Sequence, residues 1–232
     1  MATVIDSFIA PPCQAEIDIL YQDDALVVIN KPSGLLSLSG KNPENWDSVH
    51  HRLTKVFAGC TLVHRLDFGT SGLLIIARNK EINAALCQQF SQRTIEKTYH
   101  ALLRGHLQQD EGIIDAPIAK DVDHFPLMRI DTATGKPAQS HFQVERRTEY
   151  RLANGHLLPV TQVKLSPLTG RTHQLRIHCQ YLGYPILGCD LYGGRDASDI
   201  APFPRLMLHA SAVRFQHPLS GKIMMLESPL PF

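Results

Sequence analysis

The chain has 232 residues, 44% of them hydrophobic, and 23 Lys plus Arg against 22 Asp plus Glu give a formal net charge of +1. This composition predicts a globular protein with a substantial core and excludes a strongly basic chain, so any nucleic-acid surface must be local. No apolar run approaches the ~20 residues of a membrane-spanning helix, and we expect no membrane partner. Five scattered cysteines without a Cys-x-x-Cys pair, and an N-terminus unlike a secretory signal, predict a cytoplasmic protein.

The N-terminal part of the chain is expected to contain an arm and then a hairpin. Residues 1–16 have no sustained period and predict a tail or an arm lying on the body. Residues 17–232 show no linker and no repeat, so we expect one domain there. Its first element is a hairpin of Ile19–Tyr21 and Ala25–Ile29, which leads into a loop at Asn30–Gly34.

A polar loop that enters a buried strand is the centre of the predicted fold. Asp47 is expected to cap a short helix before it. The turn residues Gly69–Gly72 then lead into Leu73–Ala77, a continuous apolar run typical of a strand covered on both faces. Asn79 is a suitable cap for a second helix, which ends near Ser91.

The rest of the chain alternates strands with one helix. The expected elements are the strand Lys97–Arg104, a long irregular excursion between Gly112 and Pro137, the strands Gln139–Arg147 and His156–Leu165 turning at Asn154-Gly155, the helix Thr172–Leu182 ended by Gly183, and a hairpin of Leu206–Phe215 with Ile223–Leu226. On the helix, His173, Arg176 and Gln180 share one polar face.

The central loop carries His64, Arg65 and Asp67 within four positions. Arg65 cannot lose its proton and Arg176 lies on a helix, so either can hold Asp67 ionised. An ionised, positioned Asp is a competent nucleophile toward a sugar carbon. The alternative is that Asp67 only caps a loop or joins an ion pair.

Two other chemistries are disfavoured by spacing. His64 with Asp67 could share a metal, but the chain has no His-Glu-x-x-His and no cysteine pair, and His173 and His178 lie five apart on the predicted helix. Ser71 lacks the Gly-x-Ser-x-Gly elbow of an acyl-transfer nucleophile. We therefore expect no metal site.

Three further residues have two interpretations each. Tyr99 suits a half-buried core position, or a stack on a planar ring such as a nucleobase. Arg171 and His173 at a helix start suit a phosphate, although Arg at a helix end is also a common surface residue. The residues alone leave these alternatives open.

Several motifs, in the right order from about Ile19 to the C-terminus, resemble the RluA family of RNA pseudouridine synthases. They are His64-Arg65-Leu66-Asp67 with Thr70-Ser71-Gly72, the preceding Asn30-Lys31-Pro32-Ser33-Gly34, Lys97-Thr98-Tyr99, Gly170-Arg171-Thr172-His173-Gln174-Leu175-Arg176-Ile177-His178, and Leu206-Met207-Leu208-His209-Ala210.

The resemblance implies an α+β fold, with a largely antiparallel mixed sheet, flanking helices and a central RNA-binding cleft. It implies that Asp67 is the nucleophile, that Tyr99 stacks on the target uracil, that Arg176 pairs with Asp67, and that Arg65 fills the space left by the flipped nucleotide. Neither a cofactor nor a metal is implied, and we expect a monomer. Asp67 could attack C1′ of the uridine, or remove a proton after the C1′–N1 bond breaks.

The expected substrate is an unpaired segment of tRNA, of 23S rRNA, or of both, since a base is extruded most cheaply there. Larger family members carry an N-terminal S4 module, and residues 1–16 leave no room for one, so the chain resembles the compact RluA branch. Where that branch has a basic RNA-clamping loop, residues 121–129 here are less basic. The alternatives are a catalytically silent RNA-binding module and, less favoured, a metal-dependent hydrolase built on His64 and Asp67.

Overall fold

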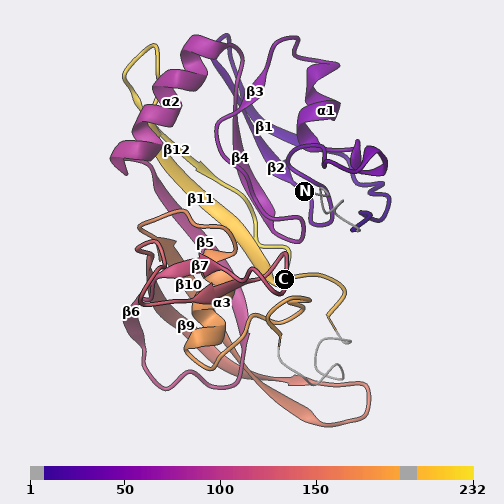
Figure 1. The fold of residues 1–232 in the computed structure, drawn as a ribbon, viewed down its shortest axis with the longest axis vertical. Helices are drawn as coiled ribbons and strands as arrows, with labels where there is room; N and C mark the ends of the chain where they lie inside the picture. The colour runs from indigo at the N-terminus through magenta and orange to yellow at the C-terminus, as the bar shows by residue number, and fades with distance from the viewer. Residues whose placement is uncertain (1–7, 194–202) are drawn as a thin grey trace. The chain divides into compact units, whose positions relative to one another are not determined.

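The computed structural model describes residues 8–193 and 203–232, which form two compact units (Figure 1). Unit 1 comprises Met1–Glu96 and Ala212–Pro229, and unit 2 comprises Lys97–Ser211 and Leu230–Phe232. Among the described residues, no helix has the length and apolar character needed to cross a membrane. The first seven residues of the predicted tail lie outside the described part of the chain.

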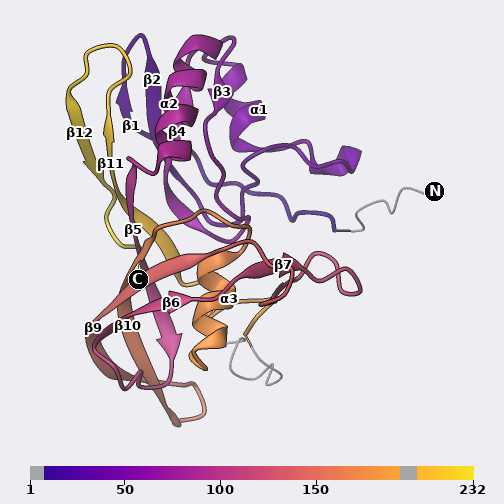
Figure 2. The same cartoon turned by 60° about the vertical axis from the view of Figure 1, so that its left-hand side comes forward.

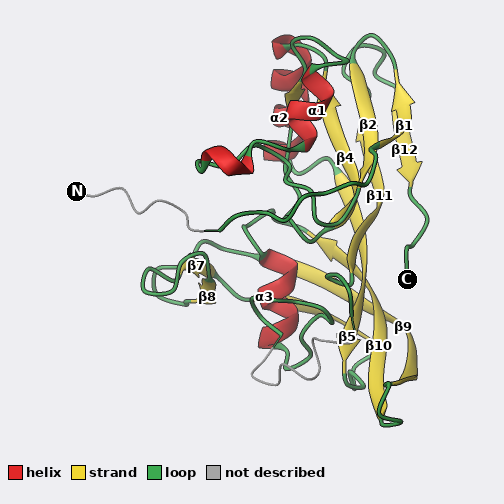
Figure 3. Ribbon diagram, turned by 90° about the vertical axis from the view of Figure 1, so that its right-hand side faces the viewer, coloured by secondary structure: helices red, strands yellow, loops and turns green. Residues whose placement is uncertain are grey.

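Unit 1 is an antiparallel sheet with helices packed on it. Its elements are β1 (Asp18–Gln22), β2 (Leu26–Lys31), the 3-10 helix η1 (Pro43–Asn45), α1 (Val49–Thr54), β3 (Thr61–Leu62), β4 (Ser71–Ala77), α2 (Lys80–Gln92), the end of β11 (Leu208–Gln216) and β12 (Ile223–Glu227). β2 lies between β1 and β4, β3 also pairs with β4, and β11 forms a hairpin with β12. Both α1 and α2 lie on the same face of the sheet (Figure 3).

The local signals for β4 and α2 are confirmed. Every residue of β4 is buried, as a continuous apolar run in a covered strand requires. The Asn79 side chain accepts the Ile82 N–H over 2.9 Å and so caps α2. Ile82 and Leu86 face the core with Val28 and Ile75, which fixes the helix on the sheet.

The cap predicted for α1 is wrong by one residue. Ser48 is the N-cap, and its hydroxyl accepts the His51 N–H over 3.1 Å. Asp47 instead forms an ion pair with Arg52 at 2.6 Å. Asp and Ser are both good cap residues. The Arg52 guanidinium binds the Asp47 carboxylate, which leaves Ser48 to cap the helix.

Residues 8–17 form an extended arm without regular secondary structure, held on unit 1. Arg52 donates to the carbonyls of Ala15 and Cys13, at 2.6 and 2.5 Å. Asn45 donates to the Phe8 carbonyl over 2.7 Å, and its Oδ1 accepts the Ala10 N–H. The described part of the arm therefore lies on the body, as one of the two sequence alternatives expects.

Unit 2 packs one helix on an antiparallel sheet. Its elements are β5 (Glu96–Arg104, from Lys97 on), β6 (Glu111–Asp115), β7 (Ile118–Lys120), β8 (Met128–Ile130), β9 (Gln139–Arg151), β10 (Leu157–Pro167), α3 (Gln174–Tyr181) and the start of β11. β10 pairs with β5 and β9, and β9 pairs with β6. α3 lies beside the separate β7–β8 hairpin (Figure 2).

Two sequence expectations for unit 2 need correction. The excursion between Gly112 and Pro137 is not irregular, because it contains most of β6 and all of the β7–β8 hairpin. These strands have only three to five residues, too few to show a period. The predicted helix 172–182 is shorter, Gln174–Tyr181, and Gly183 follows its cap with φ of 85° as expected.

The mixed α+β class is confirmed. The core of unit 2 is formed by inward residues of β5, β9 and β10 together with the apolar side of α3, including Leu103, Phe142, Val163 and Leu175. β5 and β11 each run from one unit into the other without an intervening loop residue. The division between the units therefore coincides with no linker in the sequence.

Candidate active site

The loop that carries Asp67 is fixed through its backbone. The Ser37 hydroxyl donates to the Leu66 carbonyl over 2.7 Å and lies 3.1 Å from the Leu66 N–H, which donates to it. The Asp67 carbonyl accepts the Thr70 N–H over 3.1 Å, which closes the turn. The half-buried Asp67 side chain therefore starts from a backbone with little freedom.

A buried ammonium holds the same loop from behind. Lys31 is 0% exposed, and its Nζ donates to the carbonyls of Leu35, Pro32 and Phe68, at 2.7, 3.0 and 3.2 Å. The Phe68 carbonyl also accepts the Gly34 N–H over 2.9 Å. A buried charge is tolerated only when it is hydrogen-bonded, and here the acceptors are loop carbonyls.

Ser33 completes this arrangement, which we call the loop clamp (residues 31–37 acting on 66–70). Its hydroxyl donates to the Gly69 carbonyl over 2.6 Å, so each carbonyl from Leu66 to Gly69 has a donor. Arg65 is exposed at the start of the loop. The segment Asn30–Gly34, whose role the sequence left unspecified, thus holds the loop of the predicted nucleophile.

His64 has a structural use. Its Nε2 accepts the Ile75 N–H over 3.1 Å, and its ring lies 4.8 Å from the Phe90 ring. The lone pair of Nε2 is therefore engaged by a backbone amide and is not available to a metal ion. This geometry weakens the hydrolase alternative, which needed His64 as a ligand.

In unit 2, Arg176 is held on α3 by several contacts. It is 4% exposed, and its guanidinium pairs with Asp190 at 2.5 Å and donates from Nε to Cys189 Sγ over 3.3 Å. Its Cζ lies 5.4 Å from the centre of the Tyr192 ring. The pairing of Arg176 with Asp67, a residue of unit 1, stays a prediction.

His173 joins the same group. It precedes α3 with a left-handed φ of 55°, and its Nδ1 lies 2.9 Å from the Tyr192 hydroxyl. The Met128 N–H donates to that hydroxyl over 2.8 Å, so Tyr192 connects β8 to the start of α3. Tyr192 therefore contacts both His173 and Arg176 and holds the two side chains in place.

A buried amide organises the turn before α3. Gln174 Oε1 accepts from the Thr169 hydroxyl over 2.8 Å and from the Arg171 N–H over 2.9 Å. Its Nε2 donates to the Gln139 carbonyl and to Ser140 Oγ, both at 2.9 Å. All four bonds of one side chain serve to place this turn and the backbone of Arg171.

His178 extends this network into the core. It is fully buried, with Nδ1 2.9 Å from Ser140 Oγ and Nε2 3.0 Å from the Ala116 carbonyl. Burial lowers the pKa of His178, against smaller raising effects of the Ala116 bond and of Asp115. We define the side chains of Thr169, Gln174, Ser140 and His178 as the α3 network.

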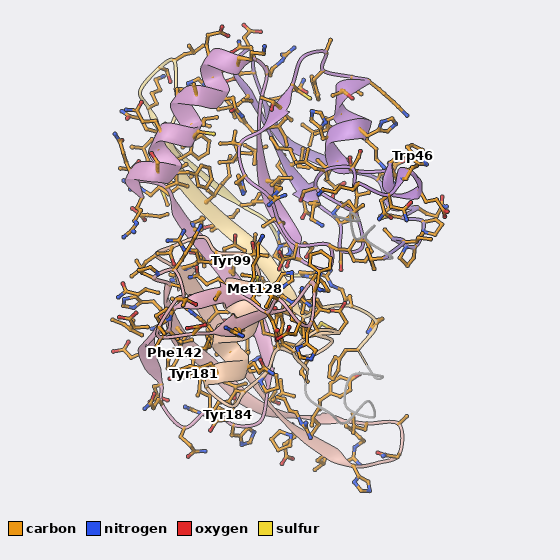
Figure 4. The ribbon with its side chains drawn as sticks, in the orientation of Figure 1. Trp46, Tyr99, Met128, Phe142, Tyr181 and Tyr184 are labelled. Carbon is orange, nitrogen blue, oxygen red and sulfur yellow. The ribbon has the colours of Figure 1, made fainter. Side chains whose placement is uncertain are left out.

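Tyr99 lies on β5, half-buried and packed against the core of unit 2, opposite Leu165 of β10 (Figure 4). This placement is compatible with both sequence interpretations. Burial lowers the pKa of nearby Lys97, at the start of the Lys-x-Tyr motif. Its ammonium form is therefore less favoured than in water.

The structure groups the predicted site residues by unit. Asp67 and Arg65 share one loop of unit 1, whereas Tyr99, Arg171, His173 and Arg176 belong to unit 2. Asp190 and Tyr192 were missed by the sequence analysis. The only signal was an Asp and a Tyr beside glycines after the helix, and no period or motif rule marks such a loop.

An open cavity of about 550 Å³ in unit 2 does not coincide with the predicted site. It is lined by β6, β9 and β10 residues, among them His141, Gln143 and Lys164. None of the six predicted residues lines it.

The site thus has an Asp on a fixed loop and a buried Arg on a helix. Comparison of the chain with known proteins shows one class of enzyme. Residues 25–181 match the profile of the family described as RNA pseudouridylate synthase. The structure is similar to the solved structure entitled Human RNA Pseudouridylate Synthase Domain Containing 1, with a TM-score of 0.78 and 32% identity, covering 96% of this chain and 86% of that chain.

Curated relatives narrow the class. The Dual-specificity RNA pseudouridine synthase RluA of Vibrio vulnificus is 42% identical over 222 residues, covering 96% of this chain and 86% of the relative. The protein of the same name from Escherichia coli K12 is 40% identical over 222 residues, covering 96% and 97%. The chain belongs to the RluA family of RNA pseudouridine synthases, which are isomerases.

Proposed function

We propose that this protein isomerises specific uridines to pseudouridine in unpaired loop segments of tRNA, of 23S rRNA, or of both, with Asp67 as the nucleophile. The observation that carries the proposal is the loop clamp, whose donors hold the carbonyls of Leu66, Phe68 and Gly69 on both sides of the Asp of the family motif. Relatives that share 40–42% identity are named dual-specificity enzymes, which supports two RNA targets.

The reaction moves one glycosidic bond within the substrate. The C1′–N1 bond breaks, the uracil turns over and a C1′–C5 bond forms. C5 loses its proton and N1 gains one, either by direct transfer or by exchange with solvent, so the substrate and the product have the same composition. Asp67 attacks C1′ as carboxylates do in retaining glycosidases, or it accepts the proton from C5 after bond cleavage. We favour a covalent or ion-pair stage at C1′.

The remaining roles follow the sequence assignment. Tyr99 stacks on the extruded uracil, and Arg176 pairs with Asp67 and keeps it ionised. Arg65, exposed on the Asp67 loop, occupies the space that the flipped nucleotide leaves. Arg171 and His173 contact phosphate at the start of α3. We propose that residues 17–232 act as one catalytic domain, as a monomer in the cytoplasm, without cofactor or metal.

The β7–β8 hairpin bears on target choice. Its loop carries Asp121, paired with His124 at 3.1 Å, and the exposed Val122 and Phe125. A loop of this composition offers less attraction to phosphate than a basic one. We therefore expect this enzyme to depend on shape and stacking here more than on charge.

Asp67→Asn tests the proposal. Turnover should be abolished, while RNA affinity stays within about 1 kcal/mol because phosphate and shape contacts elsewhere carry binding. The assay maps pseudouridines by carbodiimide-dependent reverse-transcription stops on unmodified bulk tRNA and rRNA. No new stops with the wild-type protein on either RNA would refute the enzymatic function and leave a silent binding module.

Arg176→Met provides the second arm. We expect almost no turnover, and a wild-type rate would exclude the proposed pairing with Asp67. Activity that persists in excess chelator would dispose of the metal-dependent hydrolase.

A further inference from the structure

The single tryptophan of the chain lies in an unusual position for a large aromatic residue. Trp46 is 55% exposed, directly after η1, and Figure 4 shows it at the margin of unit 1. Buried tryptophans are the norm, and an exposed one beside cations suits contact with another molecule.

Two basic side chains of α1 and its cap lie against this ring. The Lys55 ammonium is 5.9 Å from the ring centre, and the His51 ring meets it edge-on with centroids 4.9 Å apart. His51 and Lys55 are one helical turn apart and so project toward the same side. Contacts that hold the indole in one orientation reduce the entropy lost when a partner stacks on it.

The base under the ring is rigid. Asn45 is 4% exposed, and its side chain joins two backbone groups of the arm, at Phe8 and Ala10. The Ser39 hydroxyl donates to the Trp46 carbonyl over 2.7 Å. An aromatic residue presented on a fixed backbone is a stacking platform rather than a mobile side chain.

The charge around the platform is positive. Residues 41–55 contain Lys41, Arg52 and Lys55 against Glu44 and Asp47, besides His50 and His51. The hydrogen bond from Arg52 is the main cause that lowers the pKa of Asp47, against its burial, and the charges of His51 and Lys55 lower it further. The cluster therefore complements an anionic partner with planar groups.

Two serines connect the backbone of the platform to the loop of the predicted nucleophile within unit 1. Ser37 is bonded to Leu66, the residue before Asp67, and Ser39 is bonded to Trp46. Because two residues span at most ~7 Å, these contacts limit the distance between the Leu66 and Trp46 carbonyls to roughly 17 Å. A few nucleotides of single-stranded RNA cover such a distance.

We infer that Trp46, with Lys55 and His51, stacks on a nucleobase of the RNA strand that flanks the target uridine, and that the Lys55 ammonium contacts an adjacent phosphate. The inference rests on the proposed function, since RNA is the ligand. It assigns RNA recognition to a surface outside the family motifs, at a sequence-tolerant contact.

The test uses the intrinsic fluorescence of the full chain, excited at the red edge where tyrosine does not absorb, so that it reports the single tryptophan, Trp46. The Asp67→Asn variant is titrated with an unmodified tRNA transcript, and binding is followed in parallel by filter retention. We expect the emission to be quenched with the same midpoint as binding. Unchanged emission at saturation would overturn the inference, even if the wild-type protein forms pseudouridine.

Kinetics give the second measurement. Trp46→Ala should raise KM for the transcript about tenfold and leave kcat at saturating RNA near wild type, because base–aromatic stacking is lost but chemistry is not. Trp46→Phe should retain most of the affinity. Val56→Ala, a matched control at a 69% exposed residue beside Lys55, should change neither constant.

The outcomes are distinguishable. A wild-type KM in Trp46→Ala overturns the platform, whereas the absence of any pseudouridine with the wild-type protein overturns the proposed function instead. If Trp46→Ala does not fold, as circular dichroism would show, the quenching titration and Trp46→Phe still decide. Quenching by an acidic protein but not by the transcript would assign the surface to a different partner and refute the inference.

Discussion

The two units hold their predicted site residues by different chemistry. In unit 1 the loop clamp is built around a buried ammonium, Lys31, whose acceptors are backbone carbonyls. In unit 2 the α3 network is neutral and runs through side chains, ending at the buried His178. Burial lowers the pKa of His178, so its neutral imidazole is the titratable part of the α3 network. Acidification that protonates His178 should therefore loosen this network.

The largest effect is expected from Lys31→Met. The variant leaves the carbonyls of Leu35 and Pro32 without this donor, which should cost about 3 kcal/mol of stability and reduce kcat by at least tenfold. Urea unfolding and steady-state pseudouridine formation measure the two quantities. Lys222→Met, at an exposed position, is the control, and a variant at Lys31 as stable as that control would contradict the clamp.

Gln174→Leu should have the next largest effect. It removes four hydrogen bonds and leaves the Arg171 N–H and the Gln139 carbonyl with fewer partners, at about 2 kcal/mol. Gln180→Leu on the exposed side of the same helix should change stability by less than about 0.5 kcal/mol. An equal loss of stability in the two variants would contradict the role of the α3 network, because the effect would then come from a leucine anywhere on the helix.

The pH dependence of stability separates the two units further. Because burial lowers the pKa of His178 in the folded state, the unfolded chain binds the proton more readily. The stabilisation from neutral His178 is present above the unfolded value of about 6.5 and is lost as the pH falls through the folded pKa. The stability difference between wild type and His178→Gln should therefore shrink from pH 7 toward pH 5. A constant difference would refute this role.

The smallest effect on stability is expected at the hairpin tip, which neither arrangement holds. Val122 and Phe125 are 79% and 69% exposed, so replacing both with Ser should change the unfolding free energy by less than about 0.5 kcal/mol. KM for RNA should nevertheless rise several-fold if the tip contacts the substrate. If the double variant has a wild-type KM on both tRNA and rRNA transcripts, the hairpin tip has no part in the choice of target RNA.

Local signals predicted much of the fold. The run at Leu73–Ala77 and the cap at Asn79 each carry enough information within a few residues to define β4 and the start of α2. The short strands β6 to β8 were missed because three to five residues show no period. Asp47 and Ser48 are both good cap residues, and the sequence does not show which of them caps α1. Ser48 does, because Asp47 pairs with Arg52.

The candidate site was predictable as motifs but not as contacts. The polar face predicted for the helix is wrong, because His173 precedes α3 with a left-handed φ of 55°. Arg176 is buried and paired with Asp190, whereas Gln180 is exposed, and periodicity cannot reveal such a pairing. Tyr192 lies 19 residues from His173 in sequence and bonds to it only because the chain folds back after α3. Such pairings arise from tertiary packing, and no local pattern encodes them.

The N-terminal arm has a consequence for how the protein is handled. Its described residues, 8–17, form no helix or strand of their own, and a few side chains of unit 1 hold them, chiefly Arg52 and Asn45. Phe8 packs edge-on against Phe68, the residue after Asp67, at 5.4 Å. Segments held in this way open far more often than the core, so a protease should clip the arm first. The rate of cleavage would therefore measure how often Phe68 loses its contact with the arm. Bound RNA should lower this rate.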